Sequence, residues 1–156
     1  MPLVHERKGW HHERVRDRRH VITLGTMRAL GSVEQMHEVL QAAVLAGINH
    51  LETAPAYGPA EEFLGQALKR EGQQPDGGWV ITSKILPGCS VEDGQRQLDG
   101  MLQRLGISKL DNLAVHGINR PDHLQWALNG DGAALLAWAL HTGRAEQVGF
   151  SSHGDD

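Results

Sequence analysis

Four side chains that can hold or exchange protons follow short apolar segments of this sequence. They are a carboxylate, a phenol, an ammonium and an imidazole: Glu52, Tyr57, Lys84 and His116. A phenol with a pKa of about 10 can exchange a proton at neutral pH only beside a cation or another hydrogen-bond donor. Lys84 and His116 could be those neighbours, and Glu52 could neutralise a buried Lys84. Together the four predict a proton-transfer site.

Each residue also has a simpler interpretation when it is taken alone. Tyr57 could be an ordinary surface tyrosine, Lys84 a solvated lysine and His116 a loop histidine. Glu52 could be an ion-pair partner with no catalytic task. The catalytic interpretation therefore depends on a fold that brings the four side chains together.

The elements that must position these residues alternate between strands and helices. The sequence predicts strands at 21–24, 48–53, 79–82, 110–115 and 147–150. It predicts helices between Ser32 and Gly47, over 61–70, between Ser90 and Gly106, and over 133–142. This alternation indicates βαβ units and a parallel sheet, and the pattern alone permits a barrel or an open sheet. Reactive groups in such folds follow the carboxyl ends of strands, where all four residues lie.

Composition limits the classes of function. The 156 residues, 40% apolar and 22% charged, suit one globular domain. A net charge of -4 gives no general attraction to nucleic acid or to an anionic membrane. The single cysteine, Cys89, cannot form an internal disulfide, so we expect a reducing compartment and a cytoplasmic protein. No window approaches the roughly 18 apolar residues of a membrane span.

The first twenty residues differ from the rest in composition. Residues 1–20 are rich in arginine and histidine and poor in apolar residues, and we interpret them as a basic, flexible arm before a domain at 21–156. His11, His12 and His20 lack the convergent spacing of a metal site, so no metal is expected. The arm also lacks the aromatic pattern of nucleic-acid binders. Cys89 has no nearby base in sequence and is interpreted as a bystander thiol.

Several fragments, in order, resemble the aldo-keto reductase family. They are Gly47-Ile-Asn-His-Leu-Glu-Thr-Ala-Pro-Ala-Tyr57-Gly58, Glu61-Glu62-Phe-Leu-Gly65, Thr82-Ser83-Lys84, Leu105-Gly106, Leu110-Asp111 and His116-Gly117. With Gly149-Phe-Ser-Ser-His-Gly154, they look most like the bacterial branch whose full-length members carry a C-terminal iron-sulfur region, which is absent from this sequence. The resemblance implies a TIM-type (β/α) barrel, of which about five strands are present and strands six to eight are not.

The resemblance also implies an activity and roles. It implies a hydride transfer between NADP(H), with NAD(H) as the alternative, and a small-molecule carbonyl or alcohol. Tyr57 would be the proton donor, Lys84 its activating cation, and His116 would orient the carbonyl oxygen. Glu52 would stand where the family has an aspartate that pairs with the lysine, near the cofactor. The remaining cofactor contacts would come from Gly25, Thr26, Met27, Ser151 and Ser152.

Two departures keep a second interpretation open. Glu52 is one methylene longer than aspartate, and a misplacement of about 1 Å can cost roughly a hundredfold in rate. The sequence also stops after the fifth predicted strand. The chain could therefore be a truncated, non-catalytic remnant or an interaction module. A five-stranded sheet would leave two strand edges unpaired, so we expect self-association.

Overall fold

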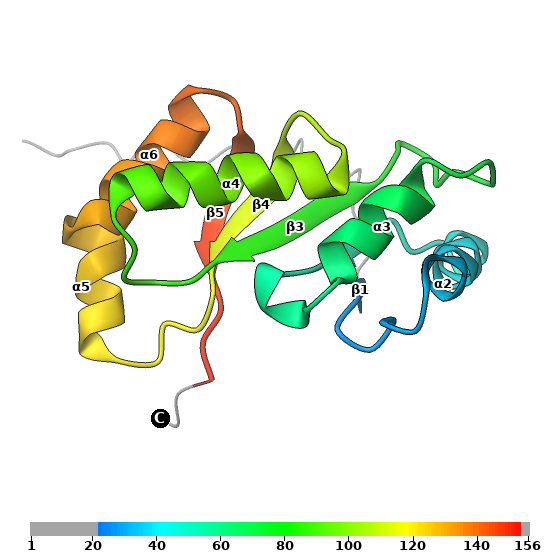
Figure 1. Ribbon diagram of the computed structural model, residues 1–156, viewed down its shortest axis with the longest axis horizontal. Coiled ribbons are helices and arrows are strands. Elements are labelled where there is room, and N and C mark those ends of the chain that lie inside the picture. Colours follow the sequence, from blue (N-terminus) through cyan, green and yellow to red (C-terminus); the bar gives the residue numbers. More distant parts are fainter. Residues whose placement is uncertain (1–21, 154–156) are drawn as a thin grey trace, which may run out of the picture.

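A single five-stranded parallel sheet organises the chain. The structure is a computed structural model and describes residues 22–153; the predicted basic arm, with His11, His12 and His20, lies outside this range. The strands are β1 (Thr23–Gly25), β2 (His50–Glu52), β3 (Val80–Ile85), β4 (Leu110–Val115) and β5 (Ala145–Phe150). They pair in sequence order, β1-β2-β3-β4-β5, and every pair is parallel (Figure 1). The five parallel strands, alternating with helices, confirm the predicted partial (β/α) barrel.

Helices connect successive strands. They are α2 (Val33–Leu45), the short 3-10 helix η1 (Pro55–Tyr57), α3 (Ala60–Leu68), α4 (Val91–Leu105), α5 (Pro121–Asn129) and α6 (Asp131–His141). The Ser32 and Ser90 hydroxyls cap α2 and α4 by accepting hydrogen bonds from backbone N–H groups, and Gly106 ends α4 with a φ of 68°. None of these helices is long and apolar enough to cross a membrane.

The boundaries differ from the predicted ones in two useful places. Strand β3 runs on to Ile85, so Lys84 lies inside the strand and not in the loop after it. Helix α5 was not predicted, because its few apolar residues form no sustained stripe and its main start signal is Pro121 at the first helical position. Both differences concern the segments that shape the site.

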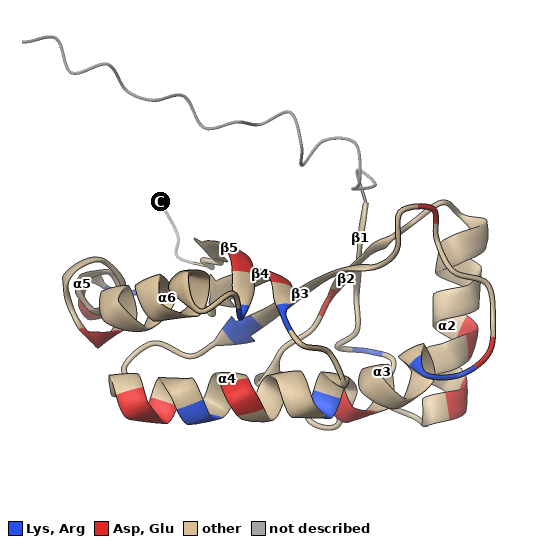
Figure 2. Ribbon diagram, turned by 90° about the horizontal axis from the view of Figure 1, so that it is seen from above, with Lys and Arg blue, Asp and Glu red and all other residues tan. Residues whose placement is uncertain are grey.

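The core lies between the sheet and the helices. Figure 2 shows α3 and α4 running along one side of the sheet, with charged residues mainly on outward helix surfaces. Alternate strand residues, among them Leu51, Ile81 and Leu113, are buried against the helices with Met36, Leu98 and other apolar side chains. Because side chains alternate along a strand, the intervening residues point to the other side, where no described helix packs.

Candidate active site

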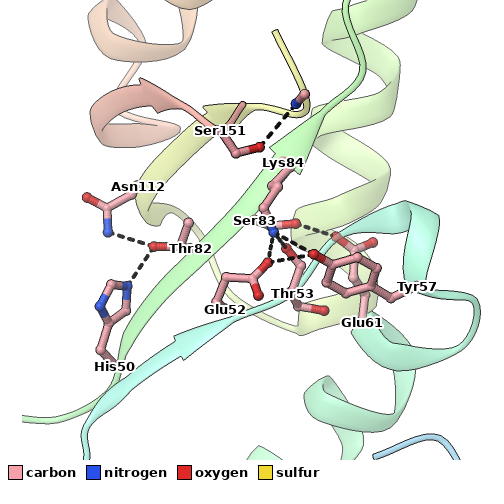
Figure 3. A network of polar contacts seen from close by, with 11 residues as sticks. His50, Glu52, Thr53, Tyr57, Glu61, Thr82, Ser83, Lys84, Asn112 and Ser151 are labelled. Carbon is pink, nitrogen blue, oxygen red and sulfur yellow. Dashed lines mark hydrogen bonds and ion pairs between the residues drawn. The ribbon is translucent and has the colours of Figure 1, made fainter. Parts of the chain in front are cut away.

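Lys84 is the centre of the predicted cluster. Its side chain projects from β3 and is almost fully buried, with 6% of the residue exposed. The Nζ atom donates a hydrogen bond to the Tyr57 hydroxyl at 3.1 Å and another to the backbone carbonyl of Thr53 at 3.2 Å. It also forms an ion pair with Glu52, which ends β2 (Figure 3). The buried ammonium thus has the carboxylate and the phenol that the sequence predicts, and also the backbone carbonyl of Thr53, which it does not.

Tyr57 reaches this cluster because the chain turns directly after β2. Pro55 starts η1, and Gly58 ends it with a φ of 61°, a conformation that favours glycine. The turn directs the phenol back over the sheet, where Lys84 Nζ lies 4.8 Å from the ring centroid. The Tyr57 hydroxyl donates a hydrogen bond to Glu52 Oε1 at 3.1 Å. The hydroxyl therefore bridges the cation and the carboxylate.

His116 completes the group from the end of β4. Its ring meets the Tyr57 ring edge-on, with centroids 5.8 Å apart and an interplanar angle of 89°. The backbone N–H of His116 donates to the carbonyl of Ile85 at 2.8 Å, which fixes the start of the loop. All four predicted catalytic residues therefore meet at one end of the sheet.

Burial and charge set the protonation of two of these groups. Burial lowers the pKa of Lys84 from its ordinary value of 10.5 to about 8. The pKa of His116 is also lowered, first by burial and then by the positive charges of Lys84 and His153. A neutral His116 has one N–H group, which can donate a hydrogen bond to a carbonyl oxygen.

A second buried network supports the strand that carries Lys84. The carboxylate of Glu61 on α3 is 1% exposed and accepts hydrogen bonds from Ser83 Oγ at 2.7 Å and from Arg104 Nε at 2.8 Å. Since Ser83 and Lys84 are consecutive, they point to opposite sides of β3. The network ties β3 to α3 and α4 behind the site. Sequence reasoning quoted Glu61 only as part of a family fragment and missed this contact.

The predicted cofactor residues fall into two groups. Gly25, Thr26 and Met27 follow β1; a Cβ at Gly25 would lie 3.3 Å from Glu52 Oε2, so the glycine leaves space beside that carboxylate. Thr26 is 1% exposed, and its Oγ1 has no hydrogen-bond partner within the described residues. Met27 is exposed. An unpartnered buried hydroxyl close to Glu52 is a suitable contact for a bound polar group.

The second group lies after β5. Ser151 Oγ accepts a hydrogen bond from the backbone N–H of Gly117 at 3.1 Å and keeps its own proton for another acceptor. Ser152 Oγ instead donates to the carbonyl of Ile118 at 2.9 Å, so it fastens the end of β5 to the loop after β4. Ser151 is therefore the better placed of the two to contact a ligand.

A pocket of about 420 Å³ opens beside His116. Its lining includes His116 and three residues that sequence reasoning did not assign to the site: Asn119, His123 and His153. His123 lies on α5, the helix that was not predicted, and this is why it was missed. Across residues 22–153, no three His, Cys, Asp or Glu side chains gather as potential metal ligands.

Comparison with known proteins identifies the family. Residues 21–154 match the model of the Aldo/keto reductase family. The L-glyceraldehyde 3-phosphate reductase of Escherichia coli (strain K12) is 28% identical over 148 residues, which are 85% of this chain and 41% of that protein. The NAD/NADP-dependent indole-3-acetaldehyde reductase of Schizosaccharomyces pombe is 33% identical over 110 residues, 70% of this chain and 37% of that protein.

Solved structures agree in fold. A Pseudomonas aeruginosa protein assigned to the aldo-keto reductases superposes with a TM-score of 0.72 at 29% identity, covering 83% of this chain and 53% of its own. The holo form of AKR11C1 from Bacillus halodurans gives a TM-score of 0.70 at 20% identity over 85% of this chain and 46% of its own, a likeness of fold alone. The chain thus spans between 37% and 53% of the length of these relatives. The match over residues 21–154 places the chain in the aldo-keto reductase family.

Proposed function

We propose that this chain carries the proton-transfer half of a carbonyl reductase site that uses NADP(H) or NAD(H). The observation that carries the proposal is the joint contact of one buried ammonium with a phenol and a carboxylate, beside an imidazole. These groups lie at the carboxyl ends of adjacent parallel strands, where β/α folds place their chemistry. Family membership supports an oxidoreductase in general.

Each residue has a role that its contacts support. Tyr57 donates the proton that an alkoxide oxygen needs after hydride addition, and the Lys84 ammonium beside it stabilises the phenolate that remains. His116, neutral because its pKa is lowered, donates a hydrogen bond to the carbonyl oxygen before reduction. Glu52 neutralises Lys84. Tyr57 and His116 thus act on the substrate oxygen, and Lys84 and Glu52 act through Tyr57.

The cofactor's contribution is a hydride for the carbonyl carbon. We propose that Thr26 and Ser151 hold polar groups of the nicotinamide end, with Gly25, Met27, Glu52 and Ser152 around it. The unpartnered buried Oγ1 of Thr26 and the free donor of Ser151 Oγ support this fit. We propose a small aldehyde or ketone as substrate.

The direct test follows a labelled hydride. The chain is incubated with an aldehyde and with NADPH carrying deuterium at C4 of the nicotinamide, and the alcohol is analysed by mass spectrometry. We expect deuterium on the carbinol carbon with the wild-type chain and a loss of at least about a hundredfold in rate with Tyr57→Phe. A wild-type chain that binds NADPH but yields no labelled alcohol would contradict the proposal, as would full activity in Tyr57→Phe.

A further inference from the structure

More histidine side chains line the pocket beside His116 than the proposed reduction requires. His116, His123 and His153 all line it, together with Asn119. Leu86 and Pro87, which follow β3, also line it. Among the described residues that line it, none carries a carboxylate. A concave site with several donors and no anion is suited to a negatively charged ligand.

We propose that this pocket binds the anionic group of the substrate, so that the preferred substrates are short aldehydes or ketones that carry a phosphate or a carboxylate. The inference rests on the proposed reduction, since His116 both lines the pocket and contacts the Tyr57 ring. It adds a substrate class that the proton-transfer residues alone do not specify.

The electrostatic surroundings favour an anion. The pKa of His116 is lowered first by burial and then by the positive charges of Lys84 and His153. These two groups contribute positive potential at His116, although the ion pair with Glu52 offsets part of that from Lys84. The same potential attracts a phosphate or a carboxylate group.

A backbone contact orients His123 in the pocket. Its Nδ1 lies 3.0 Å from the carbonyl oxygen of Gly117. A carbonyl only accepts, so Nδ1 carries a proton, and Nε2 is the ring nitrogen left to contact a ligand.

Other charges near His123 do not oppose this arrangement. The carboxylate of Asp122, the neighbouring residue, is occupied by the guanidinium of Arg120 at 3.0 and 2.6 Å, and both are exposed. Helix α5 begins at Pro121, so its positive dipole end lies at the same loop. The Asn119 Oδ1 accepts from the His153 backbone N–H at 2.7 Å, which leaves its amide NH₂ as a donor.

The test measures anion binding without turnover. Inorganic phosphate and sulfate are titrated into the whole chain while histidine Cε1–H resonances are followed by NMR. We expect saturable shifts of these resonances. Acetate in a parallel titration distinguishes a carboxylate site from a phosphate site.

Variants locate the bound anion. His153→Asn and His123→Asn should each weaken sulfate binding by about fivefold or more, whereas His141→Asn, an exposed substitution at the end of α6, should not change it. Circular dichroism checks that each variant is folded, and the exposed His153 provides a change that leaves the core intact. Tyr57→Phe should retain sulfate binding although it loses reduction.

The outcomes separate the two proposals. No saturable binding of any anion by the wild-type chain, or equal binding by wild type and His153→Asn, would overturn the pocket assignment. Sulfate binding without hydride transfer would instead contradict the proposed reduction and leave the pocket assignment standing. If the chain reduces aldehydes, an aldehyde with a phosphate group should have a KM about tenfold or more below that of its unphosphorylated analogue, and His153→Asn should reduce this difference by about fivefold or more.

Discussion

At the scale of single residues, the contact between Glu52 and Tyr57 determines which acceptor the hydroxyl proton of Tyr57 faces. The Tyr57 hydroxyl has a single hydrogen, and it donates that hydrogen to Glu52 Oε1 at 3.1 Å while accepting one from Lys84. A substrate oxygen must therefore compete with Glu52 for the proton it needs. The longer carboxylate makes this competition possible, because its extra methylene extends its reach toward the phenol.

Glu52→Asp should therefore accelerate reduction. The shorter carboxylate can still neutralise Lys84 but ends about one carbon–carbon bond short of Tyr57, so the phenol becomes free to donate to substrate. We expect kcat to rise by roughly tenfold, within the range that a displacement of about 1 Å produces. NADPH oxidation followed by absorbance measures it, with Glu52→Gln as the control that removes the charge. An unchanged or lower kcat in Glu52→Asp would show that Glu52 does not restrain Tyr57.

Lys84 supplies a prediction about pH. Burial lowers its pKa to about 8, so its charge should be lost as the pH rises through that value, and reduction should decline with it. The unfolded chain holds the same proton up to its ordinary pKa of 10.5. Between these values the unfolded state binds more protons, so this group makes the free energy of unfolding increase with pH in that window.

NMR of the lysine Cε carbons measures the titration directly. Glu52→Gln should lower the pKa of Lys84 further, because the carboxylate of Glu52 favours the charged form. Lys84→Met identifies the resonance. A Lys84 signal that titrates at 10 or above would contradict the argument from burial.

At the scale of secondary-structure elements, the site depends on how closely α3 approaches α4. A Cβ placed at Gly65 on α3 would lie 2.0 Å from the backbone carbonyl oxygen of Arg104 on α4. Only glycine allows this approach, and the approach brings Glu61 within reach of Arg104 and Ser83. The position of β3, and with it that of Lys84, therefore depends on the absence of a side chain at Gly65.

Gly65→Ala should consequently destabilise the chain, and a matched glycine should not. The clash is with backbone, which cannot move aside cheaply, so we expect a loss of about 2–3 kcal/mol in the free energy of unfolding. Gly100→Ala on α4 is the control: its Cβ would meet only the Arg104 side chain, at 3.3 Å, and alanine favours a helix by about 0.5–1 kcal/mol. Urea unfolding followed by circular dichroism compares them. Equal stabilities for the two variants would exclude the close approach.

Comparison with the sequence shows which elements are predictable. Strands β2 and β4 and helix α4 follow from apolar runs and clear stop signals such as Gly106, and the strand order follows from the βαβ alternation. The convergence of Glu52, Tyr57, Lys84 and His116 follows from the same topology, because parallel strands end at one edge. Local patterns therefore suffice for the catalytic cluster.

The parts that could not be predicted depend on tertiary contacts. No local pattern reveals that Glu61 is buried against Ser83, 22 residues away, or that α5 brings His123 into the pocket. The length of β3 was also underestimated, because Ser83 and Lys84 are polar and are tolerated inside the strand only through their partners. Pairing across the fold overrides local preference at these positions.

At the scale of the whole molecule, the two faces of the sheet differ in chemistry. On the side that no described helix covers, His50 joins Thr23 at 2.9 Å and Thr82 at 2.8 Å, and Asn112 donates to Thr82 at 2.8 Å. This hydrogen-bonded row crosses four strands (Figure 3 shows its part on β2, β3 and β4). A closed (β/α) barrel usually fills its interior with branched apolar residues, whereas this row can face water.

The strand edges, not this polar face, are therefore the surfaces on which association should occur. Within residues 22–153, β1 and β5 each pair on one side only. Val148 and Phe150 on β5 stand in register with Leu113 and Val115 of the core, yet they are 39% and 70% exposed. An unpaired edge with exposed apolar side chains is a template for another chain.

We therefore predict that the isolated chain forms dimers or larger species through β5. Chromatography with light scattering at micromolar concentration should give a mass above that of the 17.1 kDa monomer. Val148→Lys and Phe150→Lys should each shift the mass toward the monomer, because a charge beside a strand edge opposes pairing and a lysine cannot be buried unpaired. Leu45→Lys, a change of an equally apolar residue that is 79% exposed on α2, should leave the mass unchanged. A compact wild-type monomer would exclude association, and equal masses for all three variants would place it away from β5.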